Sequence, residues 1–204
     1  MLPRSRSTLH LQLGQETIYL IMAIAVFAAV VFAAMLADRR RTADVPIIQM
    51  READGFFFPN GSAALSEDFR RKLAAQIIPD VAETGRAYDA RIVEVVGHTD
   101  QVPFDSRARR AANLDETLAP LLAGEQAMAA KAADNVGLGM ARAVAVAAIL
   151  RASDRLRGYE VIPLSAGPFQ RPDDTASTGD QVVSQRERRR IVIRLRRPSP
   201  VKKG

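Results

Sequence analysis

The chain has 204 residues, 48% of them hydrophobic, and a formal net charge of +6. It has no cysteine and only two histidines, His10 and His98, so disulfides, thiol nucleophiles, cysteine-ligated metals and multi-histidine metal sites within one chain are excluded. The positive charge makes nucleic acid, anionic lipid and other polyanions the partners to weigh.

An uncharged apolar segment, IYLIMAIAVFAAVVFAAMLA, occupies residues 18–37. At about 1.5 Å per residue, a helix of this length spans the ~30 Å hydrocarbon core of a membrane. The apolar region of a signal peptide is typically only about 7–15 residues, and here no Ala-x-Ala site closes the run before DRRR at 38–41. We therefore expect a single uncleaved transmembrane helix at 18–37, after a short N-terminal segment at 1–17.

Basic residues flank this helix on both sides, so the positive-inside rule does not orient it. Glu16 is the only acid near its start. In one interpretation Glu16 lies at the interface, in contact with water. In the other the helix begins near Leu9, Leu11 and Leu13, and Glu16 lies inside the bilayer, where a carboxylate usually marks an ion pathway.

Residues 38–54 are charged and lack periodicity, which predicts a linker. A domain is expected over 55–197, beginning with a short buried strand at 56–58 and a Pro-Asn-Gly turn at 59–61. Ser66 is a candidate N-cap for a helix that Pro79 would kink or end. Its apolar face has residues four apart: Phe69, Leu73, Ile77 and Val81.

Further elements follow at intervals along the domain. Strands are predicted at 91–96, 159–163 and 189–197, a helix at 135–152, and one or two short helices within a long segment at 101–134. The tail at 198–204 is expected to be disordered. The order predicts an α+β fold, a mixed β-α-β-α-β-β sheet with helices on one face.

Four separated stretches match one family in order. They are FFFPNGSAALS at 56–66, VEVVGHTD at 93–100, NVGLGMARAVAV at 135–146 and RRRIVIRL at 188–195. The third fits an Asn-x-x-Leu-[Ser/Gly]-x-x-Arg-Ala-x-x-Val helix, and the fourth an Asn-Arg-Arg strand in which Arg188 replaces the usual Asn. The domain thus resembles the OmpA-like peptidoglycan-binding domain, with an insertion at 101–134 that departs from the family.

The resemblance implies a ligand and the residues that hold it. Asp100 and Arg142 would bind the free end of diaminopimelate in the peptidoglycan stem peptide, where an ammonium and a carboxylate share one carbon. A carboxylate accepts from the ammonium, and a guanidinium grips the carboxylate. Leu138 is positioned to pack on the aliphatic stem, and Asn135 and Thr99 would order the loop or contact the ligand.

Other residues in these motifs have supporting roles in this interpretation. Gly97, His98 and Arg189 would support the ligand loop, with His98 a loop-ordering side chain and not a catalytic base. Without the resemblance, Asp100 would simply cap a turn and Arg142 would be a solvated helix residue. The seven arginines at 186–197 are compatible with nucleic-acid binding, but a strand with a basic exposed face is favoured, and no nucleic-acid partner is expected.

The predicted function is non-covalent attachment of a membrane component to the cell wall of a Gram-negative bacterium. The protein would be a single-pass inner-membrane protein, with a cytoplasmic N-terminus at 1–17 and its C-terminal domain in the periplasm. It would have no cofactor or metal and would not be an enzyme. The alternative is a stator subunit of an ion-driven motor, because anchor, linker and wall-binding domain also follow one another in MotB- and ZorB-type proteins. That alternative makes Glu16 the candidate ion carrier and implies a MotA-like multi-span partner and a possible homodimer.

Overall fold

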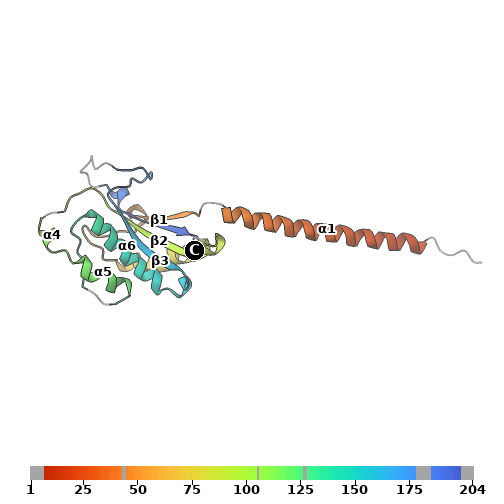
Figure 1. The fold of residues 1–204 in the computed structure, drawn as a ribbon, viewed down its shortest axis with the longest axis horizontal. Helices are drawn as coiled ribbons and strands as arrows, with labels where there is room; N and C mark the ends of the chain where they lie inside the picture. The colour runs from red at the N-terminus through yellow and green to blue at the C-terminus, as the bar shows by residue number, and fades with distance from the viewer. Residues whose placement is uncertain (1–6, 43–44, 105, 126–127, 178–184, 199–204) are drawn as a thin grey trace, which may run out of the picture. The chain divides into compact units, whose positions relative to one another are not determined.

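The fold comes from a computed structural model, which describes residues 7–42, 45–104, 106–125, 128–177 and 185–198 (Figure 1). The chain divides into two compact units, Met1–Ala43 and Asp44–Gly204. The first contains one helix, and the second contains all the strands of the described chain.

The first unit is the long helix α1, Ser7–Thr42. Within it, Thr17–Leu36 has a mean hydropathy of 2.7 and no buried side chain, so it is long and apolar enough to cross a membrane. This candidate span lies within one residue of the predicted one at each end. Glu16 lies in the same continuous helix, one residue before the span, because α1 begins well upstream of it.

The second unit is built on a four-stranded sheet in the order β1-β4-β2-β3. The strands are β1 Ile47–Arg51, β2 Ile92–His98, β3 Glu160–Gly167 and β4 Arg190–Arg196. β2 and β3 are parallel, and β4 is antiparallel to both β1 and β2. The predicted α+β class, the mixed sheet and the element order are confirmed.

The predicted position of the first strand was wrong. Residues 56–58 form no strand, and β1 instead lies inside the segment predicted as a linker, followed by a 3-10 turn, Glu52–Asp54. β1 is specified by its partner: Met50 pairs with Ile191 of β4 and is completely buried. Phe56 and Phe58 are also buried, but they pack edge-on against Phe69 at centroid distances of 5.2 and 4.9 Å. The aromatic run therefore indicated burial and not strand pairing.

Between β1 and β2 the chain forms α2 (Glu67–Lys72), a π-helical turn (Leu73–Ile77) and α3 (Ile78–Ala87). Ser66 caps α2 as predicted, its Oγ accepting from the backbone N–H of Phe69 at 3.1 Å. Pro79 does not end the helix. It has no N–H to donate to the preceding turn, and the π turn, in which Ile78 N–H donates to Leu73 O, lies directly before it.

The core lies between the helices and one face of the sheet. Buried side chains of β2 and β4 share one cluster with those of α2, α3 and α6 (Asn135–Ala152): Val93, Val95, Ile191, Ile193, Leu195, Phe69, Val81, Val146 and Leu150. Helices on one face of the sheet, as predicted, follow from this arrangement. α6 also has the length and composition of a membrane span, but half of it is buried in this core.

The remaining helices are short. The 101–134 segment contains α4 (Ser106–Arg110) and α5 (Leu114–Leu122), in agreement with the one or two helices expected there, and α5 lies beside α6 (Figure 1). Single 3-10 turns at Asp154–Leu156 and Arg186–Arg188 precede β3 and β4. The 198–204 tail lies almost entirely outside the described residues.

Candidate functional site

A cavity of about 430 Å³ opens at the carboxyl end of β2. Its lining comes from four parts of the chain: Asn60, Gly61, Asp100, Val102, Pro103, Phe104, Asn135, Leu138, Arg142 and Arg189. Four of the five predicted ligand residues are among them, together with the predicted supporting residue Arg189. The carboxylate after the second strand and the guanidinium on the later helix therefore face one space.

Two glycines allow this convergence. A Cβ atom at Gly97 would lie 1.9 Å from the carbonyl oxygen of Gly139, so the backbones of β2 and α6 touch at this point. Only residues without a side chain permit such an approach. The contact holds the first turns of α6 against the end of β2, and the supporting role predicted for Gly97 takes the form of a backbone contact.

Asp100 belongs to a chain of charges. Arg189 donates from Nη1 to Asp100 Oδ2 at 2.7 Å and from Nε to Glu52 Oε2 at 2.7 Å. All three side chains are between 10% and 13% exposed, so solvent screens these pairs less than surface pairs. The pKa of Arg189 is raised above its ordinary value, chiefly by the hydrogen bond to Glu52, with burial opposing and Asp100 adding to the effect. Arg189 is thus a permanent cation at the cavity wall.

Arg142 is buried and not a solvated helix residue. It is 2% exposed, and its guanidinium donates to the carbonyls of Ser62 at 3.0 Å and Pro59 at 3.3 Å. The same group lies 4.9 Å from the centre of the Phe58 ring, a cation–π distance. Burial lowers its pKa to about 10, with repulsion from Arg189 contributing, so it remains charged at neutral pH. Arg142 therefore fixes the 59–62 turn that forms one wall of the cavity.

Asn135 and Thr99 have different positions relative to the cavity. Asn135 lines it and donates from Nδ2 to the carbonyl of Val102 at 2.9 Å, which orders the loop after β2. Thr99 does not line it. It is 1% exposed, and its hydroxyl donates to the carbonyl of Asn135 at 3.3 Å, so it joins the loop to α6 and does not face a ligand.

The expectation that His98 orders the ligand loop was wrong. His98 is the last residue of β2, completely buried, and neither ring nitrogen has a hydrogen-bond partner. Gly97 faces α6, and because side chains alternate along a strand, His98 points to the opposite face of the sheet. Burial, followed by repulsion from Arg190 and Arg194, lowers its pKa to about 3, so the ring is neutral.

Glu52 was missed because it lies in the segment assigned as a linker. Its carboxylate is 10% exposed and lies 2.7 Å from Arg189. No local pattern in the sequence connects it to Asp100, since the two meet only through an arginine at the start of β4. Phe104 was also missed, because the 101–134 segment departs from the family pattern.

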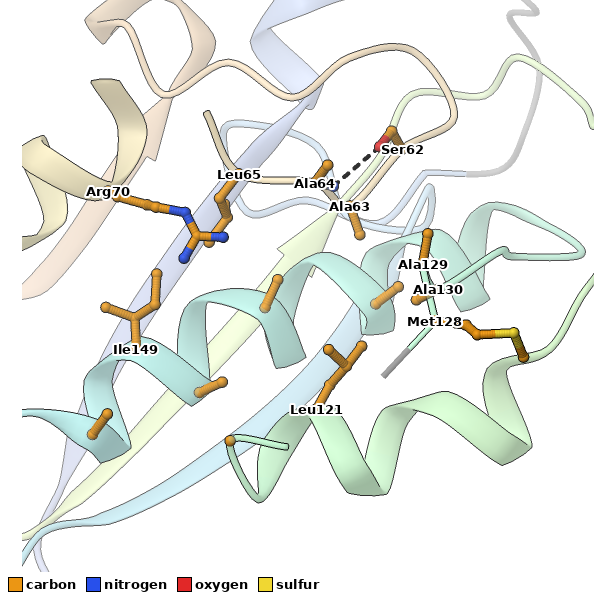
Figure 2. Close-up of a pocket in the computed structure, with 15 residues that line it drawn as sticks. Ser62, Ala63, Ala64, Leu65, Arg70, Leu121, Met128, Ala129, Ala130 and Ile149 are labelled. Carbon is orange, nitrogen blue, oxygen red and sulfur yellow. Dashed lines mark hydrogen bonds between the residues drawn. The ribbon is translucent and has the colours of Figure 1, made fainter. Parts of the chain in front are cut away.

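A second hollow, a groove of about 360 Å³, runs along α6 on the other side of the 62–65 segment (Figure 2). Figure 2 shows Ile149 of α6 and Leu121 of α5 turned toward it. Arg70 is the only charged residue that lines it within the described chain. The groove lacks paired opposite charges, unlike the Asp100 cavity.

Among the residues that the structure describes, no three His, Asp or Glu side chains are grouped so that they could hold a metal ion. The chain matches no family model and no curated protein. Solved structures similar in fold to this chain are MotB-like and OmpA-like domains.

Three of these structures illustrate the degree of similarity in sequence and fold. A MotB-like protein of Desulfovibrio vulgaris is 13% identical, with a TM-score of 0.45, over 74% of this chain and 75% of that one. The periplasmic domain of Helicobacter pylori MotB is 16% identical, with a TM-score of 0.41, over 75% and 76%. The OmpA-like domain of FopA1 from Francisella tularensis is 15% identical, with a TM-score of 0.38, over 75% of each chain.

Proposed function

We propose that the second unit binds peptidoglycan non-covalently through the diaminopimelate of the stem peptide, and that α1 anchors this unit to the inner membrane. The observation that carries the proposal is that Asp100 and Arg142 line one cavity, with Leu138 in its wall. The four motifs of the OmpA-like family supply the identity of the ligand. The domain would then lie in the periplasm, where peptidoglycan is found.

The residue types suit a zwitterionic amino-acid end. Asp100 accepts from the ammonium, and the two cations, Arg142 and Arg189, attract the carboxylate. Leu138 contacts the methylene chain. Each charge-assisted hydrogen bond contributes about 1.5–3 kcal/mol, which gives modest, reversible binding at each site.

The cavity is also organised before a ligand arrives. Arg142 is held by two main-chain carbonyls and the Phe58 ring, and Asp100 is held by Arg189. Side chains that are already fixed lose little conformational entropy on binding. Such a site suits a tether that binds and releases many equivalent stem peptides.

The experiment is a pulldown of the full chain, in detergent, with purified sacculi. We expect Asp100→Asn and Arg142→Lys each to weaken binding about 10-fold or more. The first removes the charge of a contact, and the second removes the guanidinium fork that binds a carboxylate in bidentate fashion. Asp115→Asn on α5 and Arg157→Lys after the 3-10 turn are the exposed controls and should bind as wild type does. Circular dichroism checks that each variant is folded, and folded site variants with wild-type binding would refute the proposal.

Free diaminopimelate provides a second measurement on the same site. It should compete with sacculi for the wild-type chain, whereas 1,5-diaminopentane, which has the same chain and amines but no carboxylate, should compete less. Release of soluble fragments from sacculi would instead indicate a hydrolase.

A stator function is the second candidate, and it is favoured by the position of Glu16 inside α1 and not at its beginning. Glu16 would then carry an ion beside a MotA-like multi-span partner, with the domain fixed to the wall, and two copies of the chain would pair. Glu16→Gln should abolish ion-driven activity and leave sacculus binding unchanged, since the wall-binding site belongs to the other unit. Motor activity that survives Glu16→Gln would exclude this role and leave the passive tether.

A further inference from the structure

Basic side chains form a row across three strands on the sheet face opposite the helices. Arg190 of β4 is the cross-strand partner of Arg51 on β1 and of His98 on β2. Side chains directly opposite one another on one face are close neighbours, and like charges in such positions are destabilising. His98 is neutral and Arg51 is paired with Asp54, so Arg190 is the charge in this row that calls for a compensating anion.

The guanidinium of Arg190 has few acceptors and no close carboxylate to balance its charge. It is 3% exposed, and its Nη2 donates to the carbonyl of Arg171 at 2.9 Å, but Nε and Nη1 have no hydrogen-bond partner. Within the described chain no carboxylate lies within 4 Å of it, and Asp173 and Asp174 interact with it only at longer range. Buried guanidinium nitrogens without hydrogen-bond partners are costly, so native structures normally supply acceptors for them.

A cavity of about 580 Å³ adjoins this arginine. Arg190, Arg51 and Arg186 line it together with Gln49 and Phe57. The ring of Phe57 is 47% exposed, which leaves an apolar surface beside the cations.

The acids at this cavity leave the cations incompletely balanced. Arg51 is paired with Asp54 at 2.8 Å, and Glu52 is engaged by Arg189 at 2.7 Å, while Arg186 approaches Glu52 only to 3.9 Å. Glu187 also lines the cavity, but no ion pair joins it to these arginines within the described residues. Among the described residues, Arg186 and Arg190 are thus the two cations of this cavity without a carboxylate closer than 3.9 Å.

We propose that this cavity is an oxyanion site that takes a carboxylate or a phosphate group. The guanidinium groups of Arg190 and Arg186 would bind its oxygens, with the amide of Gln49 as a further donor and Phe57 against the organic part. This cavity shares no lining residue with the Asp100 cavity. The proposal therefore does not depend on peptidoglycan binding at Asp100.

The test measures binding of inorganic phosphate and of acetate, separately, to the full chain in detergent by isothermal titration calorimetry. Ionic strength is held constant with chloride. We expect saturable binding of at least one ion. Saturation by phosphate alone identifies a phosphate group as the ligand, and saturation by acetate alone identifies a carboxylate. Saturation by both shows a site for the oxyanion group that the two ions share.

Arg186→Gln carries the comparison, because its side chain is 81% exposed and the change leaves the core intact. It should weaken binding about 10-fold, and Arg190→Gln should abolish it. Arg157→Gln, at a side chain that is 82% exposed, is the matched control and should bind as wild type does. No saturable binding of either ion, or equal loss in Arg186→Gln and Arg157→Gln, would overturn the proposal.

Discussion

His98 carries two buried ring nitrogens without partners and lies beside Arg190 and Arg194 on the face of the sheet away from the helices. Its sequence neighbours, Gly97 and Asp100, serve the cavity at the end of β2, but His98 does not. Consecutive residues of this motif therefore lie on opposite faces of the sheet, because successive side chains of a strand point in opposite directions.

The pKa of about 3 for His98, below its ordinary 6.5, gives the protein a pH-dependent stability. Between these values the unfolded chain binds a proton at this residue and the folded chain does not. Its contribution is therefore complete above pH 6.5 and is lost as the pH falls toward 3, at up to about 1.4 kcal/mol per pH unit.

Chemical denaturation of the full chain in detergent from pH 7 to 4 measures this slope. His98→Gln should flatten it by removing the titrating group. His10→Gln, the control at the other histidine, should keep the wild-type slope. Equal slopes in wild type and His98→Gln would show that His98 takes up its proton without unfolding.

A methyl group at Gly97 has no space. Gly97→Ala would place Cβ 1.9 Å from the carbonyl of Gly139, so β2 and α6 must separate. We expect the free energy of unfolding to fall by about 1–3 kcal/mol or more, together with a loss of sacculus binding.

Gly137→Ala is the matched control for this substitution. Its Cβ would come closer than 3.4 Å only to the movable tip of Leu114, at 2.8 Å, and alanine is the better helix former. A Gly97→Ala chain as stable as Gly137→Ala would contradict the close backbone contact.

At the scale of elements, the helical segment from Ser66 to Ala87 shows how local signals act within a tertiary setting. Ser66 begins the helix where the sequence predicts it, since an N-cap acts through a hydrogen bond within one turn. Pro79 was expected to kink or end the helix, yet α3 continues, because the π turn accommodates the missing donor and the Val81 face remains in the core.

The cap itself is testable. Ser66→Ala should lower the free energy of unfolding by about 1 kcal/mol, because it leaves the Phe69 N–H without its acceptor. Ser153 also stands at an N-cap position, but its side chain makes no capping bond, so Ser153→Ala should change stability little. Urea titration of both variants compares them, and equal effects would assign no stabilisation to the cap.

At the scale of the whole molecule, the chain joins an apolar helix to a unit with a core of its own. The core cluster of the second unit draws on β1–β4 and the α2, α3 and α6 helices, and it includes no residue from the part of α1 whose burial the structure describes. Stability of this unit should therefore be independent of the anchor.

A chain consisting of residues 44–204 tests that independence. It should be soluble without detergent and should unfold in one cooperative transition, with the midpoint that the second unit shows in the full chain. Tryptophan is absent from the sequence, so far-ultraviolet circular dichroism is the suitable probe. A molten, uncooperative fragment would show that α1 contributes to folding.

The sequence by itself was sufficient for the apolar helix, the Ser66 cap, and the class and order of elements, whereas Asp100, Leu138 and Arg142 were selected through the resemblance to the OmpA-like family. Each of these features depends on a continuous hydrophobic periodicity, on a single turn of the chain, or on a motif of residues close together in sequence. The tertiary structure alone decided that β1 forms at Ile47–Arg51, that Glu52 reaches Asp100 through Arg189, and that His98 and Arg190 share a buried basic row. These features arise from pairings between segments distant in the chain, and the free energy of such a pairing depends on both partners, so neither segment reveals it alone.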